Sequence, residues 1–428
     1  MTTPEPPGAP AAEAHRAPRG GVTGWVLFDF ATTTFSFVVV TRYLNDWIID
    51  ERGEPDIVIG IMTAVISVAL LLTLPALGGR ADRLGRHLPV LRPFSALSIG
   101  ATALLAFVGP TWLALTVAGI AIFAFYVADS QYHPLLATVA PPERRGRVSG
   151  TAVAAGLVGS FLALLLLGAL VDEGHAQDAF LPAAVIYGLF ALPLLVGVRE
   201  PRRPGPAVDD GSPTAVRRLI AGVRRARGTP YGRLLLARFL YVDAVATAIQ
   251  FMAVYARRTG DFDDDTIDLV LAVSILTAIA GAVGAGLLAA RRGSAPVIRG
   301  TVMIVVAALL VVAVSGSGWV LWVAGPCIGG ALGALSTVDR ILMLELVPDG
   351  RRGEEFGLFA LVGKLSVGFG PLVLWGGTVL VGTELGLSKL DASRCAVIML
   401  ALSAAGGLVL LRGLKAPPRS APVASPAS

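Results

Sequence analysis

Apolar residues in this chain come in long runs, and short polar connections separate one run from the next. An α-helix needs about twenty residues to cross a hydrocarbon layer about 30 Å thick, which is roughly the length of these runs. The pattern predicts twelve membrane-spanning helices, at 22–47, 56–77, 91–109, 111–138, 148–171, 180–198, 232–256, 266–289, 298–315, 318–346, 356–381 and 394–412.

The longest polar stretch inside the chain, 199–230, separates six of these helices from six. We therefore expect an all-α polytopic membrane protein with an N-terminal half at 21–198, a cytoplasmic central loop at 199–230 and a C-terminal half at 231–412. The two ends, 1–20 and 413–428, are rich in Pro and Ala and have no apolar core like that of a signal peptide. Both are expected to be disordered cytoplasmic tails.

Composition narrows the class of protein. The mean hydropathy is +0.72, with 54% hydrophobic and 15% charged residues, whereas a soluble chain of this length needs a more polar surface. The net charge of +5 comes from Arg in short loops, so no nucleic-acid partner is predicted. No Walker A motif is present, which argues against an ATP-driven pump. Cys327 and Cys395 lie in apolar runs, and no disulfide, metal site, cofactor, catalytic residue or enzyme activity is predicted.

The charges of the connections alternate along the chain and predict the orientation in the membrane. One set of connections is basic, and the other set is acidic. The basic set contains Arg80, Arg83, Arg86, Arg144, Arg145, Arg147, the loop 199–230, Arg291, Arg292, Arg351 and Arg352. The acidic set contains Asp46, Asp50, Glu51, Glu54, Asp172, Glu173, Asp178, Asp261, Asp263, Asp264 and Asp265. Because basic loops stay on the cytoplasmic side, both termini are expected in the cytoplasm, with the protein in the cytoplasmic membrane.

Short motifs recur in order in the two halves, which indicates an internal repeat. Asp29 and Asp243 take equivalent places in the first and seventh predicted helices. At an offset of 207 residues, other positions align in pairs: Arg144–Arg145 with Arg351–Arg352, Gly156 with Gly363, Tyr132 with Asp339, and His133 with Arg340. Duplicated halves around a central loop are typical of transporters, whose binding site lies between the halves near the middle of the bilayer.

The segment Gly78-x-x-Ala-Asp82-Arg83-x-Gly85-Arg86 resembles the loop 2–3 signature of the major facilitator superfamily. Glycines let helix ends approach closely, Asp82 can cap a helix, and the arginines can hold the loop at the cytoplasmic surface. The resemblance implies a role in conformational gating, whereas plain positive-inside charge is the alternative. The gating residues expected here and in the matching basic segments are Gly78, Asp82, Arg83, Gly85, Arg86, Glu143, Arg144, Arg145, Gly146, Arg147, Arg351 and Arg352. The second copy has Ala290 in place of Asp82, so any latch is expected to be asymmetric.

A narrower resemblance extends over most of the chain. It comes from the runs Trp-x-Leu-Phe-Asp-Phe-Ala at 25–31, Ala-Pro-Pro-Glu-Arg-Arg-Gly-Arg-Val-Ser-Gly at 140–150, Arg-Phe-Leu-Tyr-x-Asp at 238–243 and Glu-Phe-Gly-Leu-x5-Gly-Lys at 355–364. Together these resemble the bacterial "unknown major facilitator" permeases, relatives of autophagy-related vacuolar amino-acid effluxers. Thr32, His133 and Asp339 depart from that family's pattern, which implies a different substrate.

Ionisable residues inside the predicted helices are costly in lipid, so they usually face a cavity or a charged partner. We expect a substrate and proton pathway formed by Asp29, Thr33, Asp129, Tyr132, His133, Asp243, Asp339, Arg340 and Lys364. In one interpretation Arg340 or Lys364 holds an anionic group, and Asp29 or Asp243 holds an amine or a coupling proton. In the other, these charges form salt bridges between helices. Arg238 is a further cation at a depth similar to that of the buried acids. Because Arg42 and Arg238 lie nearer helix ends, snorkelling to the membrane surface is an alternative for both.

The sequence thus favours a secondary active transporter that works as a monomer among membrane lipids. Proton coupling is expected from the buried acidic residues and the missing ATPase motif. The resemblance implies a small polar or zwitterionic substrate, an amino acid for example, and export. Two alternatives stay open at this point. One is a multidrug exporter of hydrophobic compounds on the same fold, and the other is a non-transporting membrane scaffold or sensor.

Overall fold

The computed structural model describes residues 21–172, 174–201, 215–315, 317–347 and 352–414, and all regular secondary structure in these residues is helical. Eleven of the described helices are long and apolar enough to cross a membrane, and one bent pair of helices supplies a twelfth span. The twelve predicted spans are thereby confirmed. Large apolar side chains such as Leu72, Val196 and Val314 are exposed on the outside, as expected of a surface that faces lipid.

The N-terminal half contains the first six spans. Its elements are α1 (Gly21–Phe35), η1 (Ser36–Tyr43), η2 (Asp46–Glu51), α2 (Ile57–Leu84), α3 (Leu88–Leu105), α4 (Thr111–Tyr132), η3 (His133–Leu135), α5 (Leu136–Val139), α6 (Pro142–Gly168), η4 (Ala176–Ala179) and α7 (Phe180–Gly197).

The central polar stretch contains a helix of its own, α8 (Ala215–Ala226), which packs against α9 and α14 of the C-terminal half and also touches α2. The C-terminal half then consists of α9 (Pro230–Gln250), α10 (Met252–Thr259), α11 (Asp264–Arg292), α12 (Ser294–Ser315), η5 (Gly318–Val320), α13 (Leu321–Leu346), α14 (Arg352–Phe369), η7 (Gly370–Gly377), α15 (Thr378–Glu384) and α16 (Lys389–Leu411).

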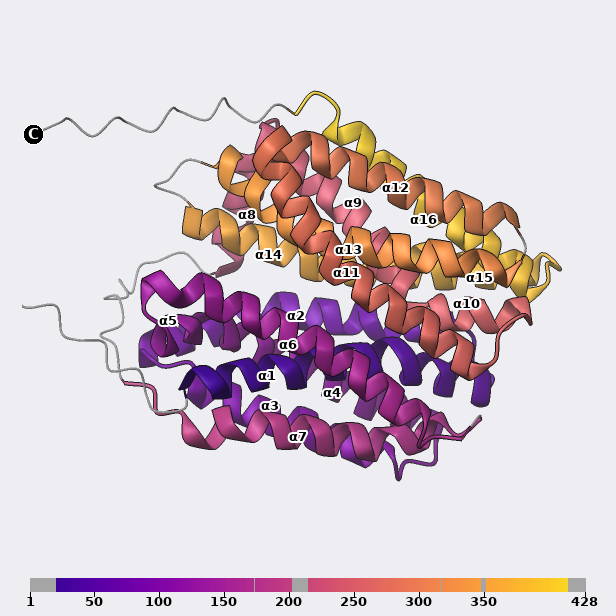
Figure 1. Cartoon of the computed structure of the whole chain (residues 1–428), viewed down its shortest axis with the longest axis horizontal. Helices are drawn as coiled ribbons and strands as arrows, with labels where there is room; N and C mark the ends of the chain where they lie inside the picture. The colour runs from indigo at the N-terminus through magenta and orange to yellow at the C-terminus, as the bar shows by residue number, and fades with distance from the viewer. Residues whose placement is uncertain (1–20, 173, 202–214, 316, 348–351, 415–428) are drawn as a thin grey trace, which may run out of the picture.

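The two halves lie side by side with their helices running in similar directions (Figure 1, indigo to magenta below and pink to yellow above). We call the end where α2 meets α3 and α11 meets α12 the arginine-rich end. The opposite end, with the connections 51–56 and 259–264, is the acidic end. Both described chain ends, at the start of α1 and after α16, lie at the arginine-rich end (Figure 1).

Small residues let some helices touch through their backbones. A Cβ added at Gly281 of α11 would lie 2.0 Å from the Gly330 carbonyl oxygen, and one at Gly333 of α13 would lie 1.8 Å from the Ala278 carbonyl oxygen. In lipid the hydrophobic effect does not drive helices together, so such close packing is a main source of their association. The pair α11 and α13 therefore forms a tight unit within the C-terminal half.

Besides the fourth span, which contains the 3-10 turn η3, three of the predicted spans depart from regular α-helix. The first changes from α-helix to π-helix at η1 and η2, and the eleventh becomes π-helical at η7. The seventh bends by 52° between α9 and α10, where Phe251 separates the two helices. η7 contacts α2, η1 contacts α9, and η2 contacts α10, so each irregular segment touches the opposite half. Wide or broken turns inside helices are often found at functional sites.

Several helices also run further than expected at the arginine-rich end. We predicted a connection at 78–86, but α2 continues to Leu84, and only Gly85, with a φ of 61°, ends it. Similarly, α6 already begins at Pro142, although the predicted span begins at 148. Arg side chains reach the polar surface from the end of a helix, so these charges do not force the helix to stop at the edge of the hydrocarbon layer.

Candidate functional site

A cluster of charged side chains joins the two halves near the middle of the helices. Lys364 Nζ on α14 lies 3.3 Å from Asp129 Oδ2 on α4, and 4.0 Å from the centre of the Tyr126 ring. One turn along, His133 Nε2 lies 3.5 Å from Asp129 Oδ1. The His133 side chain is 64% exposed, so it faces open space rather than the core. Asp129 thus lies beside one basic side chain from each half.

A second charged group lies wholly within the C-terminal half. Asp339 on α13 is 1% exposed and forms an ion pair with Arg238 on α9. The Tyr241 hydroxyl donates a hydrogen bond of 2.5 Å to the other oxygen of the same carboxylate. Arg238 also lies over the ring of Phe359, 4.0 Å from its centre. Arg238 therefore points into the protein, and the alternative that it snorkels to the membrane surface was wrong.

Arg340 follows Asp339 directly and differs from it, because its side chain is exposed. No carboxylate among the described residues lies within ion-pair distance of its guanidinium, although Asp129 and Asp339 act on it electrostatically. Arg340 lines a cavity of about 100 Å³ in the C-terminal half. A guanidinium in that position has donors to offer to an anion.

Asp29 and Thr33 lie on α1 where it meets α6. A Cβ added at Gly156 would lie 2.7 Å from Thr33 Oγ1 and 3.0 Å from Asp29 Oδ2, so this glycine makes room for both side chains. Asp29 is partly exposed and interacts electrostatically with His133 and Asp129. The structure therefore brings Asp29 near the charged cluster on α4.

Tyr132 and Asp243, by contrast, are enclosed. The Tyr132 hydroxyl donates to the Trp25 carbonyl oxygen at 3.0 Å, and the two rings stack with centres 4.5 Å apart. Asp243 is 0% exposed and accepts a hydrogen bond of 2.8 Å from the backbone N–H of Gly370, at the start of η7. Neither residue lines the cavity beside Arg340.

The expected gating residues lie at the arginine-rich end. Gly78 and Arg83 are in the last turns of α2, and Gly85 and Arg86 follow it. Arg145 donates to the Ala140 carbonyl oxygen at 3.2 Å and so caps the end of α5, while Arg144 and Arg147 are exposed. The structure does not describe Arg351, nor the side chains of Asp82, Glu143 and Arg352. For Gly146 it describes the backbone helix only.

Sequence reasoning missed an ion cluster that closes the acidic end. Arg42 on η1 is 2% exposed, pairs with Asp46 and Asp268, and has its Nη2 3.2 Å from Asp264 Oδ1. Arg257 on α10 pairs with Asp264 and reaches Asp46 Oδ2 at 2.7 Å. We call these five residues the first ion cluster. Arg42 does not snorkel, because its partners on α11 lie on the other half and hold it inside.

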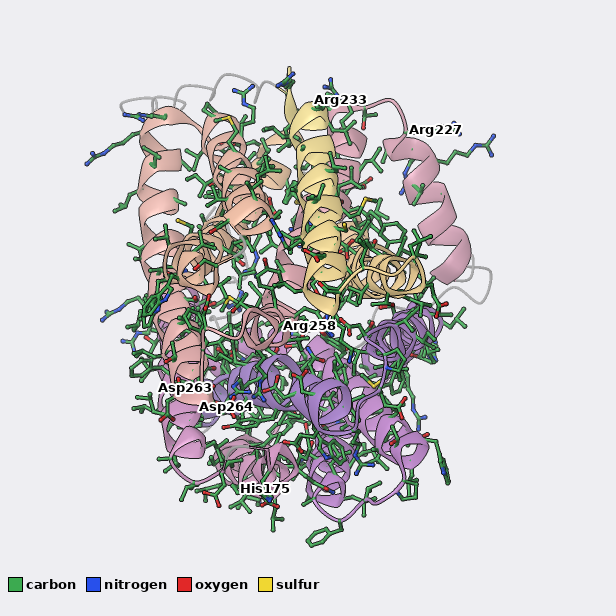
Figure 2. The ribbon with its side chains drawn as sticks, turned by 90° about the vertical axis from the view of Figure 1, so that its right-hand side faces the viewer. His175, Arg227, Arg233, Arg258, Asp263 and Asp264 are labelled. Carbon is green, nitrogen blue, oxygen red and sulfur yellow. The ribbon has the colours of Figure 1, made fainter. Side chains whose placement is uncertain are left out.

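A second ion cluster lies beside the first. Arg258 on α10 binds both oxygens of Asp56, at 2.5 and 2.8 Å, and also the Ser393 hydroxyl at 2.7 Å. The Trp375 indole N–H on η7 donates to Asp56 Oδ2 at 2.6 Å. Figure 2 shows Arg258 and Asp264 where the C-terminal half meets the N-terminal half. Arg257 and Arg258 lie next to an acidic connection, where the charge pattern of the loops predicts few basic residues. Their position was the feature of the sequence that could have indicated both clusters.

Comparison with known proteins agrees with this geometry. The family model described as Major Facilitator Superfamily matches residues 23–371. An uncharacterized MFS-type transporter, YxiO of Bacillus subtilis (strain 168), is 24% identical over 383 residues, which cover 82% of this chain and 86% of that protein. The putative uncharacterized transporter YgaY of Escherichia coli (strain K12) is 35% identical over 89 residues, 21% of this chain and 23% of YgaY.

Solved structures share the fold at low sequence identity. The nucleoside transporter NupG has a TM-score of 0.72 with 13% identity, over 92% of this chain and 99% of NupG. A bacterial homolog of the human lysosomal transporter Spinster has a TM-score of 0.63 with 16% identity, over 94% of this chain and 95% of the homolog. The human organic anion transporter MFSD10 has a TM-score of 0.60 with 20% identity, over 93% of this chain and all of MFSD10. At these identities the likeness concerns the fold.

Proposed function

Because this chain belongs to the major facilitator superfamily, we propose that it is a secondary active transporter of a small polar or zwitterionic solute with an acidic group, such as an amino acid. One observation carries the proposal. Arg340 is exposed beside a cavity, and the described residues offer it no ion-pair partner. A cation kept inside a membrane protein at this cost usually serves an ion or substrate pathway. Both halves come from one chain, so a monomer suffices for transport.

The ion clusters support alternating access. In the described conformation Arg42, Arg257 and Arg258 tie the halves together at the acidic end. A solute could pass that end only after these ion pairs separate. The irregular segments of the spans, which are η1, η2, α10 and η7, contribute residues to the two ion clusters. We therefore assign the outer gate to these contacts.

The arginine-rich end is assigned to the cytoplasm, with the protein in the cytoplasmic membrane and both chain ends inside. Single cysteines at His175 and Arg227, exposed at the acidic and arginine-rich ends, test this in a background with Cys327 and Cys395 replaced by Ala (Figure 2). A membrane-impermeant thiol reagent added to intact cells should label the variant at 175 and leave the variant at 227 unlabelled. The opposite pattern would reverse the orientation.

We assign the coupling proton to Asp29. This carboxyl is partly exposed beside the charged cluster and can exchange protons with it, whereas Asp243 is enclosed and holds the Gly370 N–H. In proteoliposomes, Asp29→Asn should abolish the part of uptake that an imposed proton gradient stimulates, while solute exchange at equal pH continues. Gradient-stimulated uptake that survives in Asp29→Asn would move the proton site elsewhere.

The solute-binding assignment is tested by transport across a panel of amino acids, carboxylates and hydrophobic drugs. Arg340→Ala should abolish uptake of the transported solute, and Arg340→Lys should restore part of it, because Lys keeps the charge without the planar fork of donors. Uptake of hydrophobic cations, unaffected by Arg340→Ala, would favour a multidrug exporter. Transport of no solute by the folded parent protein would favour a membrane scaffold.

A further inference from the structure

The cavity beside Arg340 is built from one face of each of three helices. α9 contributes Val242 and Val245, and α13 contributes Leu332 and Leu335, at spacings of three residues that place each pair on one face. Phe359 of α14 closes the third side. These five side chains give the cavity an apolar lining beside the charged groups of the same helices, and such a combination is the usual make-up of a small-molecule site.

The polar groups of the cavity favour an anion over a zwitterion. Asp339 is the only acidic side chain among the described residues that line it, and both its oxygens are already bonded, one to Arg238 and the other to the Tyr241 hydroxyl. Arg238 and Arg340 give the lining two guanidiniums against this one carboxylate. An ammonium group entering the cavity would therefore find no free acceptor of opposite charge among the lining residues, and it would meet a net positive field.

We infer that this cavity binds the aliphatic part of an organic anion whose acidic group is held by Arg340, and that it prefers carboxylates without an α-amino group. The inference rests on the proposed function, since it takes the solute bound by Arg340 as the one transported. A dry apolar cavity of about 150 Å³ accommodates a benzene ring. The cavity here, about 100 Å³, is smaller, so the fitting group is a branched chain of about three or four carbons.

Binding of a series of carboxylates to the detergent-purified full-length protein tests the inference by calorimetry. The series is acetate, propionate, isobutyrate, isovalerate and phenylacetate, with 2-aminoisobutyrate and valine as the α-amino analogues of isobutyrate and isovalerate. Burial of each added methylene should tighten binding about fourfold up to isovalerate. Phenylacetate should bind more weakly than isovalerate, because its ring exceeds the cavity. 2-Aminoisobutyrate and valine should bind at least about tenfold more weakly than isobutyrate and isovalerate, respectively.

Two variants change the cavity in opposite directions. Val242→Phe fills it and should remove the gain from acetate to isovalerate while leaving acetate binding intact. Leu332→Ala enlarges it and should raise the affinity for phenylacetate about tenfold over that of the parent. Leu236→Phe on the exposed face of α9 and Val323→Ala on the exposed face of α13 are the matched controls, expected to match the parent.

The outcomes separate this inference from the proposed function. Carboxylates could bind in a way that depends on Arg340 while affinity does not rise from acetate to isovalerate, in the parent or in Leu332→Ala. That result would overturn the apolar site and leave the proposed function standing. Tighter binding of valine than of isovalerate would overturn the preference against an amino group and would agree with zwitterion transport. Binding of no carboxylate at all would overturn both.

Discussion

The same position of the internal repeat carries different chemistry in the two halves. In the N-terminal half, Tyr132 ties α4 to α1 through a stacked Trp25 ring and a hydrogen bond to a backbone carbonyl. In the C-terminal half, its equivalent, Asp339, ties α13 to α9 through an ion pair with Arg238 and a hydrogen bond from Tyr241. Both contacts are buried and both join the first and fourth spans of their half. A neutral hydroxyl at this position of the N-terminal half thus corresponds to a buried carboxylate in the C-terminal half.

The residue that follows this position also differs between the two halves. His133 in the N-terminal half is already paired with Asp129, whereas Arg340 in the C-terminal half has no ion pair with any described carboxylate. A guanidinium keeps its charge at every physiological pH. In our proposal the C-terminal half is therefore the one that holds the anion, through Arg340.

The largest difference between the halves should appear in the free energy of unfolding of variants at the buried contacts of Tyr132 and Asp339. Arg238→Ala leaves Asp339 buried without its cation, and breaking such a pair costs about 3–5 kcal/mol. Tyr132→Phe removes one neutral hydrogen bond in lipid surroundings and should cost about 1 kcal/mol or less. Unfolding of the detergent-solubilised variants by heat or denaturant measures both. The double variant Arg238→Met with Asp339→Leu should recover most of the lost stability. Equal losses of stability in Arg238→Ala and Tyr132→Phe would contradict the contrast between the halves.

Solute binding should show the second contrast. Charge-assisted hydrogen bonds contribute about 1.5–3 kcal/mol, so Arg340→Ala should weaken binding of the transported solute about ten- to hundredfold. His133→Ala, at the equivalent position, should weaken it about threefold or less, because this exposed side chain is bound to Asp129. Calorimetry on the purified variants gives both numbers. If His133→Ala had the larger effect, the anion site would belong to the N-terminal half.

The smallest contrast concerns two equivalent glycines. A Cβ at Gly156 would lie 2.7 Å from Thr33 Oγ1 and close to Asp29, whereas one at Gly363 would lie 3.0 Å from Arg238 Nη2, the tip of a flexible side chain. Gly156→Ala should therefore destabilise by about 1–3 kcal/mol through overpacking. Gly363→Ala should change stability by less than about 1 kcal/mol, because Ala favours the helix and partly offsets the contact. Thermal unfolding of the two variants side by side checks this; similar values for both would show that the halves pack alike here.

Features that are local in the chain could be predicted from the sequence, whereas features that depend on distant partners could not. The twelve spans follow from the length of each apolar run, and the repeat follows from short motifs at a fixed offset. The ion clusters join residues more than 200 positions apart, such as Arg42 with Asp268 and Arg257 with Asp46, and no local pattern pairs them. The π-helical segments 36–43 and 46–51 contain neither Pro nor Gly, so nothing in their composition indicated a break in the helix.

The candidate site was predictable only in part for the same reason. Asp129, His133, Arg340 and Lys364 do gather near the middle of the helices, and helical spacing was enough to put them at similar depth. Depth alone does not tell which way a side chain points. Tyr132 and Asp243 have the right depth but turn into the interior of their own halves, toward Trp25 and Gly370.

The second ion cluster also gives this protein an optical signal of its own. Trp375 is 1% exposed, stacks on Phe251 with ring centres 4.8 Å apart, and donates its indole N–H to Asp56 of the opposite half. Separation of the halves at the acidic end would break that hydrogen bond and bring water to the ring. In a variant whose other five tryptophans are replaced by Phe, emission should shift to longer wavelength whenever the acidic end opens. The fluorescence of one native residue would then follow the transport cycle in real time without an added label.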